Sequence, residues 1–297
     1  MNMKSDFDGL LLETAVVEPE GAPKGIIAFS HGMAEHKERY FDFMKYLASA
    51  GYLCVIHDHR GHGGSVKSSA DYGYFYTEDI QGIVGDLHQV ISSVKKEHPE
   101  LPVYLFSHSM GTLVARCYLK QYDGEIDKVV LCGPPTENKM AGMGLALAKG
   151  MKPFMGKNTP NLLLNMMAFG PFVKKFPKSE SWLSVCQENA RAYAEDPLCG
   201  FFFTTNGFIN LMKLQLGAYE ETGWKLEHPE LPILLIAGEE DPVIQSKELF
   251  SQLATFLRER GYRNVYKKLY TGLRHEILNE KEHLQIYEDV LNFFENE

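Results

Sequence analysis

The chain has 297 residues, of which 44% are hydrophobic and 23% are charged, and its formal net charge is −9. This composition is typical of a globular protein with a large apolar core, and it excludes collagenous, disordered and repetitive classes. Because phosphate binding needs clustered Lys and Arg, the acidic balance also argues against a nucleic-acid partner.

Short apolar runs alternate with stretches of helical period along most of the chain. The runs predict strands at 26–30, 53–57, 103–107, 128–132, 233–238 and 264–270. Apolar spacings of three and four predict helices near 37–50, 77–98, 111–122, 246–260 and 281–295. Apolar strands separated by helices predict an α/β fold, with a mostly parallel sheet that has helices on both faces.

This alternation stops after Gly133 and resumes near residue 219, which predicts a helical insertion between two strands of one sheet. We therefore expect a core of residues 1–134 and 219–297 and a cap of residues 135–218. The cap lies where α/β proteins bind ligands, beyond the carboxyl ends of the strands. Its charge is positive, with nine basic residues (Lys139, Lys149, Lys152, Lys157, Lys174, Lys175, Lys178, Arg191 and Lys213) and five acidic ones.

Two features indicate the environment of the protein. The five cysteines are widely spaced and contain no Cys-x-x-Cys pair, so we expect reduced, mostly buried thiols. The N-terminus lacks the apolar stretch of a secretory signal, and no segment has the uninterrupted apolar length of a membrane span. We expect a cytoplasmic protein.

A candidate nucleophile lies where the predicted strand 103–107 meets the following helix. Ser107-His108-Ser109-Met110-Gly111 has a central serine with small residues two positions before and after it. A nucleophile elbow needs those small residues because strand and helix backbones pass closely there. The pattern alone leaves Ser109 as either a nucleophile or an ordinary turn residue.

Partners for Ser109 follow the next predicted strands in the order acid, then histidine, that this type of sheet requires. Asp241 follows the strand 233–238, with Glu239 and Glu240 as alternative carboxylates, and His275 follows the strand 264–270. A serine needs a general base that is oriented by a third group. The order predicts a Ser109–His275–Asp241 triad.

An oxyanion needs two backbone N–H donors, one after the nucleophile and one from the loop after an early strand. These are the amides of Met110 and Met33, the latter in the loop after the strand 26–30. The mechanism that follows is acyl transfer to water through an acyl-enzyme, for which no cofactor is expected.

Several motifs together resemble one known family. They are His31-Gly-Met-Ala-Glu-His36-x-x-Arg39-Tyr40, Asp58-His-Arg60-Gly-His62-Gly-Gly-Ser65, Ser107-His-Ser109-Met-Gly111, Gly238-x-x-Asp241-Pro and Arg274-His275-Glu-x-x-Asn279-Glu280. The chain resembles the α/β-hydrolase branch that contains monoacylglycerol lipases and bacterial lysophospholipases, from about residue 8 to the C-terminus. The resemblance implies the same triad and the same oxyanion hole.

The histidines at 57–62 raise an alternative, because imidazole and carboxylate groups bind zinc or iron. Their spacing is not that of a helical His-Glu-x-x-His site, and we expect no metal. The resemblance explains the stretch as a structural loop beside the active site.

The first expectation for function is an esterase of single-chain lipids, either monoacylglycerol or lysophospholipid. In the cap, Met140, Met143 and Leu147 form a stripe at helical spacing that either lines an acyl-chain site or packs the cap onto the core. The basic cap also predicts peripheral contact with an anionic membrane. Alternatives are a carboxylesterase for short or aromatic esters, a prolyl-type aminopeptidase and a non-catalytic binding protein.

Overall fold

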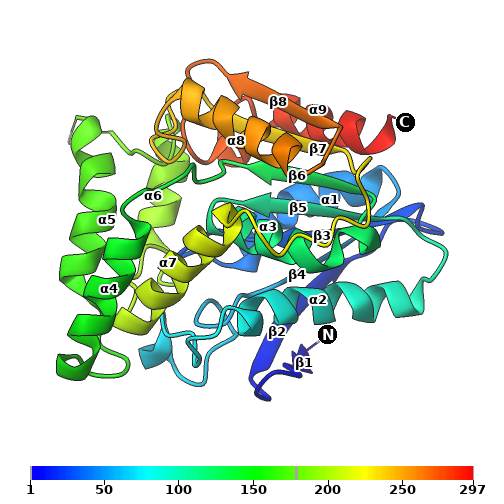
Figure 1. Cartoon of the computed structure of the whole chain (residues 1–297). Coiled ribbons are helices and arrows are strands. Elements are labelled where there is room, and N and C mark those ends of the chain that lie inside the picture. The colour runs from blue at the N-terminus through cyan, green and yellow to red at the C-terminus, as the bar shows by residue number, and fades with distance from the viewer. Residues whose placement is uncertain (1, 178–179, 297) are drawn as a thin grey trace.

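The computed structural model describes residues 2–177 and 180–296, so Lys178 of the basic cap residues lies outside the described part. In the described part, eight strands form one sheet in the order β1-β2-β4-β3-β5-β6-β7-β8 (Figure 1). Strands β3 to β8 are parallel, and β1 and β2 are antiparallel at one edge. This confirms the predicted α/β class. The strands are β1 (Asn2–Lys4), β2 (Leu11–Val17), β3 (Gly25–Ser30), β4 (Tyr52–His57), β5 (Val103–His108), β6 (Lys128–Cys132), β7 (Ile233–Gly238) and β8 (Val265–Tyr270).

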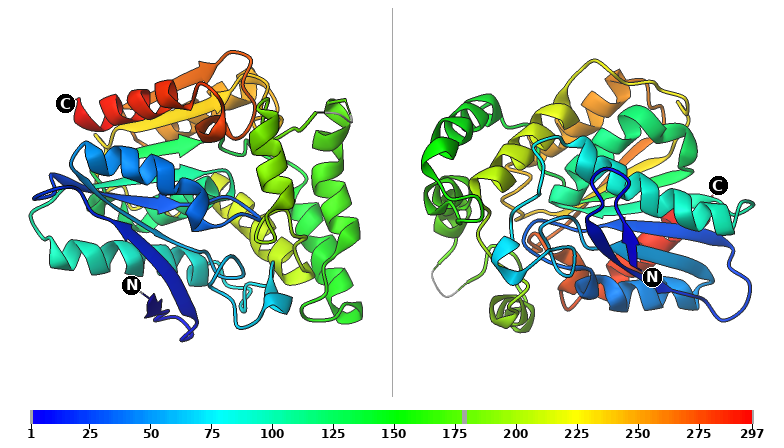
Figure 2. Two further views of the ribbon diagram at one scale, coloured as in Figure 1. Left: turned by 180° about the vertical axis from the view of Figure 1, so that it is seen from behind. Right: turned by 90° about the horizontal axis from the view of Figure 1, so that it is seen from below.

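Successive side chains along each strand point to opposite faces of the sheet, so the apolar core has two layers. Ile26 and Ala28 of β3 pack into one apolar cluster with α2 (Gln81–Glu97), α3 (Met110–Tyr122) and α8 (Lys247–Glu259). Ile27 and Phe29 pack into the other cluster, with α1 (Phe41–Ser49) and α9 (His283–Glu295). Helices therefore cover both faces of the sheet, as Figure 2 shows.

The segment between β6 and β7 forms helices at one end of the sheet (Figure 1). They are α4 (Ala141–Met151), α5 (Leu162–Lys175), α6 (Gln187–Glu195) and α7 (Thr205–Tyr219). Helix α7 packs against both α4 and the core helix α3, whereas α4 and α5 lie farther from the sheet. No helix in the ranges 2–177 and 180–296 combines the length and apolarity needed to cross a bilayer.

Candidate active site

Ser109 stands on a sharp turn between β5 and α3. Its φ of 51° is in the left-handed region that a side chain rarely adopts, as expected for a nucleophile elbow. A Cβ on Gly111 would lie 2.1 Å from the carbonyl oxygen of Ser30, so only glycine fits this position. Ser107 is buried in β5, and its hydroxyl donates to the carbonyl oxygen of Val130 at 3.1 Å. The hydroxyl of Ser107, which replaces the glycine usual at this position, therefore has a hydrogen-bond partner in the core.

The three residues expected to form a triad meet at this turn. Ser109 Oγ lies 2.8 Å from His275 Nε2, and His275 Nδ1 lies 2.9 Å from Asp241 Oδ2. Asp241 and His275 are buried, and the backbone N–H of Val243 donates to the other carboxylate oxygen of Asp241 at 2.8 Å. This geometry can move a proton from the serine hydroxyl to the imidazole.

The alternative carboxylates beside Asp241 have other partners. Glu239 forms an ion pair with Lys247 at 2.9 Å, and Glu240 lies 3.6 Å from Arg274 Nε. The Pro242 turn therefore directs only the third acidic side chain of the run at the imidazole.

Met33 and Met110 line the same cavity as Ser109. Met110 is the first residue of α3, and the first N–H groups of a helix have no partner inside the helix. In the loop of Met33, the N–H of Gly32 donates to Glu35 Oε1 at 2.5 Å. A buried carboxylate thus shapes the loop that carries one expected oxyanion donor.

Glu35 is the centre of a buried polar group beside the site. Its Oε1 also accepts hydrogen bonds from the Tyr40 hydroxyl at 2.7 Å and from His108 Nδ1 at 3.1 Å, and Arg39 lies 3.3 Å from its Oε2. Arg39 bridges further to Glu276 at 2.6 Å. Burial raises the pKa of Glu35, but His108 and Arg39 outweigh burial and hold that pKa well below its ordinary value. Glu35, Arg39 and Tyr40 belong to the motif at 31–40, but the sequence alone assigns them no role. Their contacts with one another and with His108 and Glu276 form only in the folded chain.

A cavity of about 740 Å³ extends from Ser109 between loops at the end of the sheet and the segment between β6 and β7. Polar groups such as His108, Gln215 and Gln245 border it, but most of its wall is apolar. The apolar lining includes Met33, Leu113, Met166, Phe169, Phe172, Trp182, Phe201, Leu211 and Met212. The cavity suits an ester with an apolar acyl group.

The structure does not bring Met140, Met143 and Leu147 to this cavity. Their exposed fractions are 58%, 59% and 38%, and they lie just before or on α4. The residues of the inserted segment at the cavity come instead from α5, α6, α7 and the loops around them. The methionine stripe neither reaches Ser109 nor packs the cap onto the core.

The histidine-rich loop forms a buried cluster of His31, His57, His59 and His62. Burial lowers the pKa of His57 and of His62 to about 3, so both rings are neutral at pH 7. Neither nitrogen of His57 has a hydrogen-bond partner among residues 2–177 and 180–296. Among the described residues, these four do not gather as a metal-binding group.

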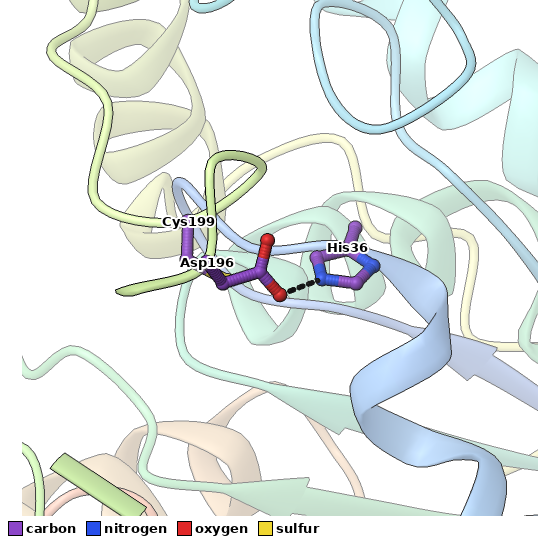
Figure 3. Close-up of side chains that lie close together, drawn as sticks. All are labelled: His36, Asp196 and Cys199. Atoms are coloured by element: carbon purple, nitrogen blue, oxygen red, sulfur yellow. Dashed lines mark hydrogen bonds and ion pairs between the residues drawn. The ribbon is translucent and has the colours of Figure 1, made fainter. Parts of the chain in front are cut away.

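The described residues do contain a different group with ligand atoms within 4.8 Å of one another, formed by His36, Asp196 and Cys199 (Figure 3). The Nε2 atom of His36 already lies 2.8 Å from Asp196 Oδ2, and Nδ1 bonds to Glu38. Burial lowers the pKa of His36, but these two carboxylates outweigh burial and raise it. Burial also raises the pKa of the Cys199 thiol, whereas metal ligation needs the thiolate. The donor set therefore fits an imidazolium between two carboxylates better than a metal ion.

The chain is similar to several known lipases and esterases. The monoacylglycerol lipase of Mycolicibacterium smegmatis is 27% identical over 288 residues, which cover 96% of this chain and 93% of that protein. The monoglyceride lipase of Homo sapiens is 28% identical over 273 residues, which cover 91% and 82%. A carboxyl esterase of Bacillus coagulans shares the fold, with a TM-score of 0.91, 24% identity and coverage of 99% and 96%.

A family model described as serine aminopeptidase, S33 matches residues 21–282. This match spans most of the sequence. The chain therefore belongs to the serine aminopeptidase S33 family and is an enzyme, a hydrolase with the α/β-hydrolase fold.

Proposed function

We propose that the protein hydrolyses carboxylic esters of single-chain lipids, with monoacylglycerol as the first substrate to test and lysophospholipid as the second. The observation that carries this proposal is the hydrogen-bonded chain from Ser109 through His275 to Asp241 at a mostly apolar cavity of about 740 Å³. The names of the two lipase relatives support the same substrate class.

In this mechanism Ser109 attacks the ester carbonyl while His275 takes its proton and later returns it to the leaving alcohol. Asp241 holds the imidazole tautomer and stabilises the imidazolium. The amides of Met33 and Met110 donate to the oxyanion. Water then attacks the acyl-enzyme with His275 as general base and releases the fatty acid.

The buried polar residues around Glu35 favour a substrate whose leaving alcohol is uncharged. The guanidinium of Arg39 and the imidazole of His108 are both bonded to carboxylates, from Glu35 and Glu276. A phosphate would have to compete with those carboxylates for them, whereas a glycerol hydroxyl needs no charge. The same pairing weakens the aminopeptidase alternative, because these carboxylates are engaged and do not await a peptide ammonium group.

We also propose that residues 135–218 act as a cap, and that its outer helices contact anionic membranes. Methionine, leucine and phenylalanine side chains are exposed in this segment, among them Phe154 at 86% and Met143 at 59%. Lysines are exposed on its outer helices, including Lys149 on α4 and Lys175 on α5. Exposed apolar groups beside cations match the two attractions of an anionic lipid surface.

The substrate proposal is tested with acyl esters of increasing chain length, together with monoacylglycerol, lysophosphatidylcholine and proline p-nitroanilide. We expect the highest kcat/KM with medium or long acyl chains, preference for monoacylglycerol and no cleavage of the anilide. Ser109→Ala should lower kcat by at least about 10³-fold and abolish labelling by a fluorophosphonate. A sharp optimum at two to four carbons contradicts the lipid proposal, and full activity of Ser109→Ala contradicts the mechanism.

A further inference from the structure

The indole of Trp182 packs on the imidazole of His275. The two ring centroids are 5.4 Å apart, and the ring planes are inclined by 33°. Trp182 belongs to the inserted segment and precedes α6, whereas His275 follows β8 in the core. The contact therefore joins the insertion directly to the residue that we propose as the general base.

Backbone contacts on both sides hold this pair in place. Before Trp182, the carbonyl oxygen of Ser181 accepts from Arg274 Nη1 at 2.6 Å. After it, the carbonyl oxygen of Leu183 accepts from the N–H of Glu276 at 2.7 Å. Because each neighbour of Trp182 accepts a hydrogen bond from one neighbour of His275, the register of the two segments is fixed.

The hydrogen bonds of the triad restrain some motions of the His275 ring more strongly than others. Asp241 and Ser109 hold the imidazole of His275 at its two nitrogen atoms, in the plane of the ring. Bonds at the two nitrogens resist in-plane displacement more strongly than tilting of the ring about the line that joins them. A ring packed on the imidazole resists that tilt, and an indole also attracts the imidazolium that forms during acylation.

We infer that Trp182 is a positioning residue for His275, which it holds in line with Ser109 and whose charged form it stabilises. The inference rests on the proposed function, because it requires His275 to be the general base. Trp182 also lines the cavity, so its action through His275 is measured with a short ester, whose acyl group makes the least contact with the cavity wall.

The same aromatic cluster supplies a matched control. Phe172 of α5 lines the cavity and contacts Trp182, with ring centroids 5.4 Å apart. It belongs to the cavity wall, where its contact with a long acyl chain should affect long substrates more than short ones.

The experiment compares wild type, Trp182→Ala, Trp182→Phe, Trp182→Leu and Phe172→Ala with p-nitrophenyl acetate and p-nitrophenyl decanoate. For the acetate, we expect Trp182→Ala to lower kcat by about 10- to 100-fold with little change in KM, and Trp182→Phe to recover most of it. Phe172→Ala should lower kcat/KM for the decanoate more than for the acetate, whereas Trp182→Ala should lower kcat for both esters. If the alanine variant does not fold, Trp182→Leu replaces it, and its kcat should stay well below that of Trp182→Phe.

Two outcomes overturn the inference: a Trp182→Ala or Trp182→Leu variant with the wild-type kcat for the acetate, or one that behaves like Phe172→Ala. Ser109→Ala distinguishes this failure from failure of the proposed function. If Ser109→Ala is inactive while the Trp182 variants keep the wild-type kcat, only the role of Trp182 is excluded. If Ser109→Ala remains active, the proposed function itself is excluded.

Discussion

Gly111 is the residue at which the elbow tolerates least change. An added Cβ would overlap the carbonyl oxygens of Ser30 and His31, at 2.1 and 2.6 Å. These are backbone atoms of the central strand β3 and the loop after it, so they cannot move aside as a side chain would. The close approach of α3 to β3 therefore depends on the missing side chain.

We expect Gly111→Ala to lower the free energy of unfolding by about 1–3 kcal/mol or more and to lower kcat, because α3 must shift and Ser109 with it. Urea unfolding and ester hydrolysis measure the two effects. Gly85→Ala on α2 is the control, since a Cβ there has open space and alanine should add about 0.5–1 kcal/mol. Equal stability of the two variants would contradict the role of Gly111.

The residues of the triad were predictable because each follows a recognisable strand, and parallel strands bring their carboxyl ends to one edge. Glu35 and Trp182 were not predictable in this way. Glu35 acts through hydrogen bonds to Gly32, Tyr40 and His108, and Trp182 meets His275 from 93 positions away in the sequence. No local pattern encodes contacts that depend on how the insertion folds back.

At the scale of elements, the six predicted strands are present with bounds close to those expected, whereas β1 and β2 were not predicted. Strand β1 has three residues, and β2 contains Glu13 and Thr14 within its apolar run. Pairing of β2 with β4 decides its conformation, and this pairing is a tertiary contact. Helices α4 and α5 were expected only as part of a helical insertion. Apolar side chains lie on their exposed faces as well, so their sequences lack the alternation of an apolar and a polar face that marks a surface helix.

The outer surface of α4 and α5 leads to a prediction about membranes. We expect binding to vesicles of phosphatidylserine and phosphatidylcholine that weakens with added salt. Lys149→Glu with Lys175→Glu should lower the affinity at least tenfold, as about 1 kcal/mol per lysine implies. The control, Lys96→Glu with Lys225→Glu, makes the same charge change at exposed core positions. Vesicle sedimentation measures both, and equal losses would show that only net charge matters.

For the whole molecule, the buried histidines couple folding to pH. Burial lowers the pKa of His31, His57, His59 and His62 below the value of about 6.5 that they have in the unfolded chain. The unfolded chain therefore binds more protons as the pH falls below about 6.5. Their contribution to stability is complete above that pH and is lost progressively as the pH falls toward their lowered pKa values.

We expect the free energy of unfolding to fall between pH 6.5 and 4, by up to about 1.4 kcal/mol per pH unit for each histidine. His57→Leu removes a buried ring with two unpartnered nitrogens, so its advantage over wild type should grow as the pH falls, to about 3 kcal/mol at pH 4.5. Urea unfolding at several pH values measures this, with the partly exposed His98→Leu as control. An advantage that is independent of pH would contradict the coupling.

The adjacency of β6 and β7 has a consequence for how such enzymes diversify. The chain leaves the sheet at the end of β6 and returns in β7, its immediate neighbour, so exchange of the intervening segment breaks no strand pairing. Because α7 packs on α3, the natural unit of exchange ends before α7. Recombination of one continuous gene segment can therefore change the substrate while the nucleophile and its base remain on inherited loops. Under the role proposed for Trp182, the segment must also present a ring to His275, which restricts which exchanged segments yield an active enzyme.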